Sequence, residues 1–215
     1  MINLKTLSPK QIGFLKLIGF LLACLPFVRL IVAAVLDQLG ANPLEFVTRS
    51  TGDWTLYFLC ITLAVTPLRK LLQWPWMLRL RRMLGLFCFF YACCHFLSFL
   101  WFDHFFDLEE MWRDGLKRPF IAVGMIAFAL LLPMAMTSTN RMIQRLGGKR
   151  WARLHQSIYL VALLALLHFF WMKAAKHNFA QPILFAGIVS LLLGLRIYWK
   201  LSGKLSGKPR ANLEI

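Results

Sequence analysis

The sequence predicts an all-α integral membrane protein, a bundle of six transmembrane helices that forms one domain over residues 1–215. Three observations predict this class. Apolar residues make up 59% of the chain, against roughly 45–50% in a soluble domain. Charged residues make up only 16%, which is too few for a water-facing surface, since soluble domains carry about 25%. The 19 Phe and 8 Trp residues exclude a disordered basic protein.

Six apolar stretches are long enough to cross a bilayer, which takes about 20 residues: residues 12–36, 54–72, 83–102, 119–138, 152–172 and 181–199. The first is about 25 residues long, and Asp37 and further spans follow it, so we expect a retained helix and not a signal peptide. Membrane helices tolerate internal prolines such as Pro67. Pro119 and Pro182 stand at span starts, where the missing N–H costs no hydrogen bond. Period-2 alternation is absent, which argues against a β-barrel.

The basic residues predict the orientation of the bundle. Four segments at one set of span ends carry 17 Lys and Arg residues: 1–16, 69–82, 139–153 and 200–215. The three loops expected at the other ends, 37–53, 103–118 and 173–180, carry only 6, and they hold eight of the nine acidic residues. The positive-inside rule therefore places both termini in the cytoplasm. The formal charge of +16 comes from short clusters beside apolar spans, which is typical of contact with anionic lipid, so we expect no nucleic-acid partner.

The five cysteines all lie inside the predicted spans. No CxxC pair occurs and no outer segment holds two cysteines, so no disulfide framework is expected. Cys93, Cys94 and His95 resemble the c-type haem attachment motif CxxCH, but Tyr91 stands where the first cysteine is needed. Any haem would therefore be held by coordination alone, and the cysteines are best explained as small apolar packing groups.

Two histidines lie deep inside spans that run in the same direction. His95 follows Arg82 by 13 residues, and His168 follows His155 by 13. Both steps rise about 20 Å along a helix, which predicts that His95 and His168 share one depth. Two imidazoles at equal depth suit the axial positions of haem iron. Hydrogen bonding between helices, metal or proton transport, and a scaffold without cofactor are the alternatives, although the lack of Asp and Glu inside the spans weighs against transport.

Neighbouring residues extend the haem hypothesis. Arg81 and Arg82 could pair with haem propionates, because a guanidinium group matches a carboxylate in a forked geometry. On a straight helix His155 would point about 140° away from His168, so the two could not serve one ligand. His155 would then belong to a second, inner site or have another task near the membrane interface.

Four stretches resemble the MsrQ (YedZ) family, haem-binding membrane subunits within the ferric-reductase-like transmembrane superfamily. The stretches are RRMLGL at residues 81–86 leading to His95, KRPF at 117–120, TST at 137–139, and WARLHQ at 151–156 leading to His168. The resemblance covers nearly the whole chain. It implies one b-type haem or two in a six-helix bundle of the bacterial inner membrane, with His95, His155 and His168 as the haem histidines. Arg82 stands where superfamily relatives with two haems carry a further histidine.

The resemblance also implies a function. Members pass electrons from the quinone pool, or from a cytosolic flavin reductase, to MsrP, a periplasmic molybdenum-cofactor reductase with which they form a heterodimer. MsrP repairs methionine sulfoxide in oxidised proteins, so the membrane subunit does not itself reduce methionine sulfoxide. Members are also described as binding FMN. A ferric-reductase-like protein that serves another acceptor is the nearest alternative.

An acidic, amphipathic outer segment offers a docking surface for such a partner. It covers residues 103–118 and contains Asp103, Asp107, Glu109, Glu110 and Asp114. Clustered carboxylates could steer a soluble partner with a basic patch. An interfacial loop that is acidic only because of its side of the membrane explains the same residues equally well.

Overall fold

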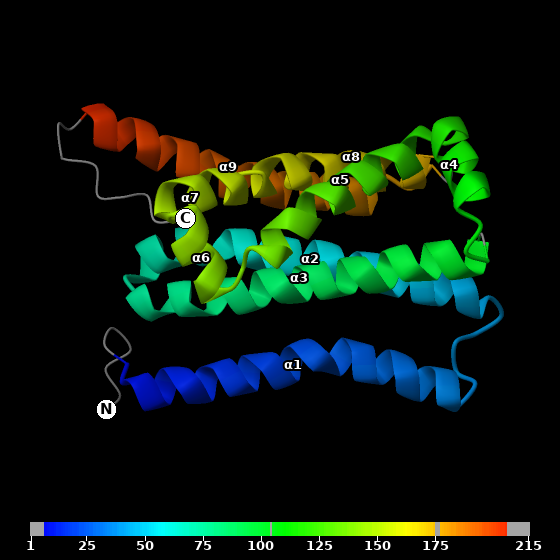
Figure 1. The fold of residues 1–215 in the computed structure, drawn as a ribbon, viewed down its shortest axis with the longest axis horizontal. Helices are drawn as coiled ribbons and strands as arrows, with labels where there is room; N and C mark the ends of the chain where they lie inside the picture. The colour runs from blue at the N-terminus through cyan, green and yellow to red at the C-terminus, as the bar shows by residue number, and fades with distance from the viewer. Residues whose placement is uncertain (1–6, 104, 175–176, 206–215) are drawn as a thin grey trace. The chain divides into compact units, whose positions relative to one another are not determined.

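The computed structural model describes residues 7–103, 105–174 and 177–205, and every regular element in them is a helix. Six helical segments in these ranges are long and apolar enough to cross a membrane, which confirms the predicted all-helical, six-span class (Figure 1). They are Pro9–Val35, Pro43–Leu72, Pro75–Phe102, Pro119–Met136, Gly148–Ala174 and Ala180–Ser202. The chain is therefore a multi-pass membrane protein.

The helices fall into two compact units, Met1–Trp112 and Arg113–Ile215. The single domain expected from the sequence stays a prediction. Unit 1 contains α1 (Pro9–Val35), α2 (Pro43–Leu72), the 3-10 turn η1 (Pro75–Met77), α3 (Leu78–Ser98) and the π-helical turn η2 (Phe99–Asp103). Unit 2 contains α5 (Pro119–Met136), α6 (Asn140–Leu146), α7 (Gly148–His155), α8 (Ile158–Ala174) and α9 (Ala180–Leu205). The short helix α4 (Leu108–Lys117) contains the boundary between the units.

Helix α2 begins eleven residues earlier than the span expected over 54–72. Hydropathy alone predicted an outer loop here, but residues 43–53 belong to the helix. Local signals account for the early start: the Asn42 side chain accepts a hydrogen bond from the Glu45 N–H (3.2 Å), and Pro43 occupies the first helical position. Polar residues such as Arg49 and Asp53 lower the hydropathy of residues 43–53 without ending the helix.

The core of unit 1 lies between the antiparallel helices α2 and α3. Leu59 and Leu63 of α2 are 1% exposed, and so is Tyr91 of α3. The Tyr91 ring stacks on Phe58 with 5.4 Å between the ring centroids. Between helices in lipid such packing is favoured by van der Waals contact and not by removal of apolar surface from water, so α2 and α3 form the closely packed part of this unit.

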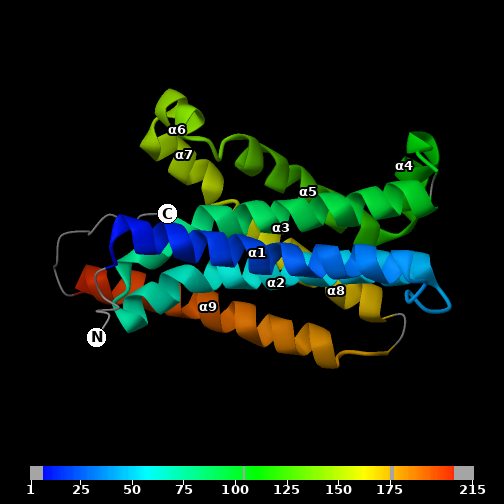
Figure 2. The same cartoon turned by 90° about the horizontal axis from the view of Figure 1, so that it is seen from below.

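Helix α1 runs alongside α3 in the same direction (Figures 1 and 2). A capping box of Ser8 and Gln11 starts it. The Tyr91 hydroxyl donates to the Ala23 carbonyl (2.7 Å) and accepts from the Phe27 N–H (3.1 Å). These two backbone groups would pair with each other in an undisturbed helix, so Tyr91 attaches α3 to α1 beside the internal Pro26.

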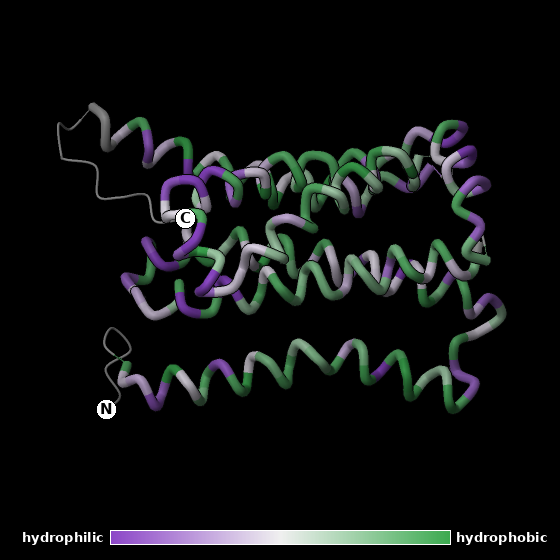
Figure 3. The backbone as a smooth tube through the Cα atoms, viewed as in Figure 1, coloured by the Kyte–Doolittle hydropathy of each residue, from purple (hydrophilic) through white to green (hydrophobic). Residues whose placement is uncertain are grey.

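In unit 2, α5 packs against α8, and α6 with α7 forms a short polar pair near one end (Figures 1 and 3). The expected span over 152–172 is not one continuous helix. It breaks at Gln156 and Ser157, where the Ser157 N–H donates to the Leu154 carbonyl (3.1 Å) and the Tyr159 N–H to the Gln156 carbonyl (3.1 Å). These i→i−3 bonds tighten the chain into a turn between α7 and α8.

Candidate functional site

The His95 ring on α3 is held against the backbone of α2. Its Nδ1 lies 2.8 Å from the Thr48 carbonyl oxygen. One helical turn further along α2, Gly52 leaves room for the ring: a Cβ atom there would lie 3.1 Å from His95 Cε1 and 3.2 Å from Nδ1. The ring therefore occupies space that any larger residue at position 52 would need. Both contacts come from the stretch that the hydropathy pattern had assigned to a loop.

His168 in unit 2 has the same surroundings. Its Nδ1 lies 2.7 Å from the Phe120 carbonyl oxygen on α5. Gly124, again one turn further along, faces the ring: a Cβ atom there would lie 2.8 Å from His168 Nδ1 and 3.0 Å from Cε1. The contact is tighter than at Gly52. Each unit thus holds one histidine on one helix, and a carbonyl and a glycine four residues apart on the antiparallel neighbour.

The bond at Nδ1 fixes the chemistry of each ring. A carbonyl oxygen can only accept, so Nδ1 of His95 and of His168 carries the proton and donates it. In a neutral imidazole this leaves the lone pair on Nε2, which is the atom that can bind a metal. Histidines that ligate metals almost always donate their other ring nitrogen to a carbonyl or carboxylate, which fixes the tautomer and the ring orientation. The chemistry of each ring therefore fits a haem ligand: His95 and His168 could each offer a neutral Nε2 to haem iron.

The two sites share a spacing in the sequence. Gly52 precedes His95 by 43 residues, and Gly124 precedes His168 by 44. Sequence reasoning singled out both histidines but missed both glycines and the two carbonyls. The repeated Gly-to-His spacing was the available signal, although a glycine inside an apolar helix has many uses and the carbonyl partners have no side-chain signature.

His155 is held differently. It is the last residue of α7, and its Nδ1 lies 3.1 Å from the carbonyl oxygen of Trp151 on its own helix. Its ring stacks on Trp151 with 4.0 Å between centroids, and its Nε2 makes a long contact of 3.5 Å with Ser138 Oγ. The Trp151 indole N–H donates to the Thr137 carbonyl (3.0 Å) and so ties α7 to the end of α5. Because the helix breaks after His155, the angle expected between it and His168 on a straight helix does not apply.

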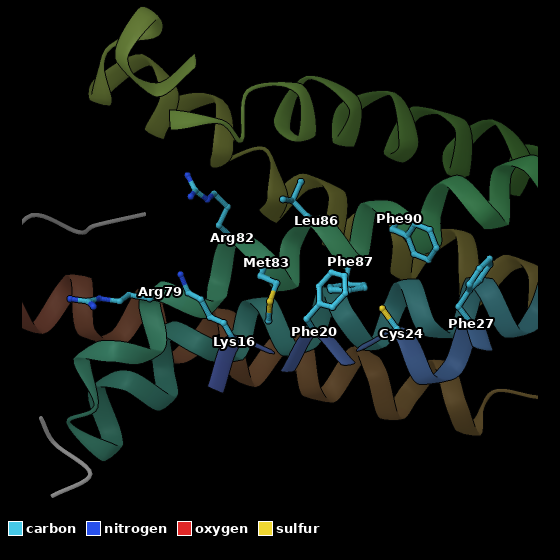
Figure 4. Close-up of a pocket in the computed structure, with 10 residues that line it drawn as sticks. All are labelled: Lys16, Phe20, Cys24, Phe27, Arg79, Arg82, Met83, Leu86, Phe87 and Phe90. Carbon is cyan, nitrogen blue, oxygen red and sulfur yellow. The ribbon is translucent and has the colours of Figure 1, made fainter. Parts of the chain in front are cut away.

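Arg81 and Arg82 lie at the opposite end of α3 from His95, a rise of about 20 Å away. Arg81 Nη1 donates to Thr66 Oγ1 on α2 (3.3 Å). Arg82 is exposed and lines a groove between α1 and α3 (Figure 4). The two guanidinium groups thus serve different faces of α3, and their pairing with propionates stays a prediction.

The other histidines and the cysteines form no comparable site in the part of the chain that the structure describes. His177 is exposed, and His104 lies outside the described residues. Within residues 7–103, 105–174 and 177–205, no cluster of three or more His, Cys, Asp or Glu side chains could hold a bare metal ion. All five cysteines are unbridged thiols inside helices.

Comparison with known proteins defines the class of this fold. A model of the ferric reductase like transmembrane component matches residues 51–166, which begin at the turn of Gly52 and end two residues before His168. No solved structure matches the chain.

The relatives narrow the class. A protein named protein-methionine-sulfoxide reductase heme-binding subunit MsrQ, from Herminiimonas arsenicoxydans, is 62% identical over 89% of this chain and 88% of its own length. MsrQ of Polaromonas naphthalenivorans is 55% identical over 83% of this chain and 82% of its own length, and MsrQ of Ralstonia nicotianae is 51% identical over 94% and 93%. The chain therefore belongs to the MsrQ proteins of the ferric-reductase-like transmembrane family, which confirms the resemblance seen in the sequence.

Proposed function

We propose that this chain is a b-type haem electron-transfer subunit of the bacterial inner membrane, and that His95 and His168 are the axial ligands of one haem. One observation carries the proposal: each ring donates Nδ1–H to a carbonyl of the neighbouring helix and rests on a glycine. Hydrogen bonding between helices would use the same Nδ1 contact and the same glycines, so the haem spectrum is the measurement that separates the two roles. Bound haem supplies one-electron redox chemistry.

The protein's own contribution is to hold the ligands rigidly. The carbonyls of Thr48 and Phe120 select the tautomer that presents Nε2, and they raise the basicity of the ring. Gly52 and Gly124 restrict the rotation of the rings by close contact. The apolar helices around the rings would set the polarity that tunes the potential of a bound haem. No proton is transferred by either histidine in this scheme.

We propose His155 for a role at the inner end of the path, either as a ligand of a second haem or near the point where electrons enter. Its support is the family resemblance and its fixed orientation against Trp151 and Ser138. Arg81 and Arg82 are proposed as cationic partners at that inner end, since they stand far along α3 from His95.

We propose a periplasmic molybdenum-cofactor reductase, MsrP, as the heterodimer partner and electron acceptor, and repair of methionine sulfoxide in proteins as the outcome. The relatives named as subunits of protein-methionine-sulfoxide reductase support this proposal. Asp107, Glu109 and Glu110 at the start of α4 are exposed and suit a docking surface for a basic partner. The quinone pool or a cytosolic flavin reductase is proposed as donor, and FMN as a further cofactor, from family resemblance.

Alanine substitution of the ligands tests the haem proposal. Protein purified from haem-replete cells should show a haem absorbance spectrum that shifts on reduction. His95→Ala and His168→Ala should each reduce the haem-to-protein ratio at least tenfold, because the iron loses an axial ligand. His177→Ala, an exposed histidine, should retain the full spectrum. Circular dichroism checks that each variant remains helical.

A colourless wild-type preparation, or full haem content in both ligand variants, would refute the haem proposal. Co-purification separates the acceptor hypotheses, since capture of a molybdenum reductase supports MsrP and capture of another redox protein supports a different acceptor. Single-turnover reduction by a quinol or by reduced flavin then distinguishes the two donors.

A further inference from the structure

Helices α1 and α3 of unit 1 form a groove of about 460 Å³. Its walls are two facing stripes at helical spacing (Figure 4). Lys16, Phe20, Cys24 and Phe27 come from α1, and the α3 stripe runs from Arg79 to Phe90. The two helices run in the same direction, so the stripes begin and end together.

The groove is cationic at one end and aromatic along the rest. Lys16, Arg79 and Arg82 lie at one end, and the aromatic rings lie beyond them (Figure 4). Two aromatic pairs join the walls: Phe20 with Phe87 at 5.3 Å between centroids, and Phe27 with Phe90 at 5.1 Å. Residues 1–36 and 54–102 contain no Asp or Glu, so these segments give the cationic end a net positive charge.

The length of the groove matches one leaflet of a bilayer. Lys16 and Phe27 are eleven positions apart, as are Arg79 and Phe90, which is a rise of about 16 Å along a helix. The hydrocarbon core of a bilayer is about 30 Å thick, so one leaflet contributes about 15 Å. A ligand with an anionic head at the cations and a chain along the aromatic rings would therefore lie as a lipid lies in its own leaflet.

We propose that this groove is a binding site for one anionic phospholipid. The phosphate lies at Lys16 and Arg79, with Arg82 at the rim, and an acyl chain follows Phe20, Cys24 and Phe27. A free phosphate would leave the apolar length of the groove empty. A neutral isoprenoid quinone could accept hydrogen bonds from the cations but would bring no negative charge to balance theirs. Basic pockets between transmembrane helices on the cytoplasmic side bind anionic lipid head groups by this combination of charge and apolar burial.

Native mass spectrometry of the full-length protein in mild detergent tests the proposal. The probes are phosphatidylglycerol, phosphatidylcholine with the same acyl chains, inorganic phosphate and a neutral isoprenoid quinone. Wild-type protein should retain phosphatidylglycerol in preference to the others. Lys16→Ala with Arg79→Ala should weaken retention roughly 30-fold, because each basic side chain near an anionic head group contributes about fivefold.

Two further variants separate the site from general charge and from misfolding. Lys149→Ala with Arg150→Ala removes two exposed cations of α7. They are predicted at the same membrane face but lie outside the groove. This double variant should change the retention of phosphatidylglycerol less than twofold. Cys24→Trp fills the groove without changing its charge and should also weaken retention. Equal losses in the two double variants would overturn the proposal. Retention of the quinone or of phosphatidylcholine to the same extent as phosphatidylglycerol would also overturn it, and so would displacement of phosphatidylglycerol by inorganic phosphate.

Discussion

The contact between a glycine and a histidine ring is the smallest feature on which the site depends. At both positions the ring and a Cβ atom would compete for the same space, since the closest approaches would be 3.1 Å at Gly52 and 2.8 Å at Gly124. Real Cβ atoms do not come as close as 2.8 Å, so an added methyl group must displace the imidazole. In the proposed haem site, such a shift would move Nε2 out of line with the iron.

Gly124→Ala should therefore impair haem binding although it adds only one methyl group. Overpacking of this kind costs about 1–3 kcal/mol, which lowers affinity by roughly one order of magnitude. Gly52→Ala should have a smaller effect, because an added Cβ would lie 3.1 Å from the ring, which would have to move by only a few tenths of an ångström. The measurement is the haem-to-protein absorbance ratio together with the reduction midpoint of the haem that remains.

Gly187→Ala is the matched control for this series. Gly187 lies in α9 with no atom within 4 Å of an added Cβ. Alanine is the better helix former, so this variant should keep its haem content and lose no stability. Equal haem content in the Gly124 and Gly187 variants would show that His168 is not confined by α5 in the way described.

Few residues of helix α1 are buried against the rest of unit 1, so the hydrogen bonds of the Tyr91 hydroxyl are important for holding α1 in place. Only Ile12, Ala23 and Pro26 of α1 are buried. The hydroxyl bonds to the Ala23 carbonyl and to the Phe27 N–H, at the place where Pro26 already lacks a donor. Tyr91 therefore packs against Phe58 and makes two hydrogen bonds with α1. Phenylalanine has the same ring but no hydroxyl, so it could keep the packing and not the hydrogen bonds.

Tyr91→Phe should keep the ring packing and lose the two hydrogen bonds. The expected loss in the free energy of unfolding is about 1 kcal/mol, and up to about 3 kcal/mol if the backbone groups are left without partners. Hydrogen exchange should rise locally at residues 23–27 of α1, while α2 stays protected. Tyr198→Phe removes a hydroxyl from an exposed ring and should change neither measurement. A uniform rise across α2 and α3 would contradict the local role.

The sequence predicted the spans well and the ends of the helices poorly, for a physical reason. Hydropathy detects the part of a helix that lies in hydrocarbon, but a helix continues wherever its backbone bonds are satisfied. The early start of α2 was signalled by Asn42 and Pro43. The break after His155 contains neither proline nor glycine, the two strongest helix breakers. The early start matters because it carries Thr48 and Gly52, the partners of His95.

Across the molecule, the two units contain the same arrangement of a histidine, a backbone carbonyl and a glycine. The α2–α3 pair and the α5–α8 pair both place a histidine against a carbonyl and a glycine of the antiparallel partner. The histidines could be selected from the sequence because ionisable groups inside a span are costly and few. Their tautomers and the glycine contacts could not, because they depend on which helices pack together and at which rotation.

The distribution of basic residues predicts the orientation of the molecule in the membrane. The segments predicted to be inside carry 17 Lys and Arg residues and those predicted to be outside carry 6, so both termini should be cytoplasmic. A fluorescent protein fused after Ile215 should fluoresce, and alkaline phosphatase at the same place should be inactive, because the first folds in the cytoplasm and the second needs periplasmic disulfides. Phosphatase fused after Gly115 in α4 should be active, since this helix should face the periplasm. The reverse pattern would move α4 to the cytoplasm, and α4 could then not be the docking surface for a periplasmic acceptor.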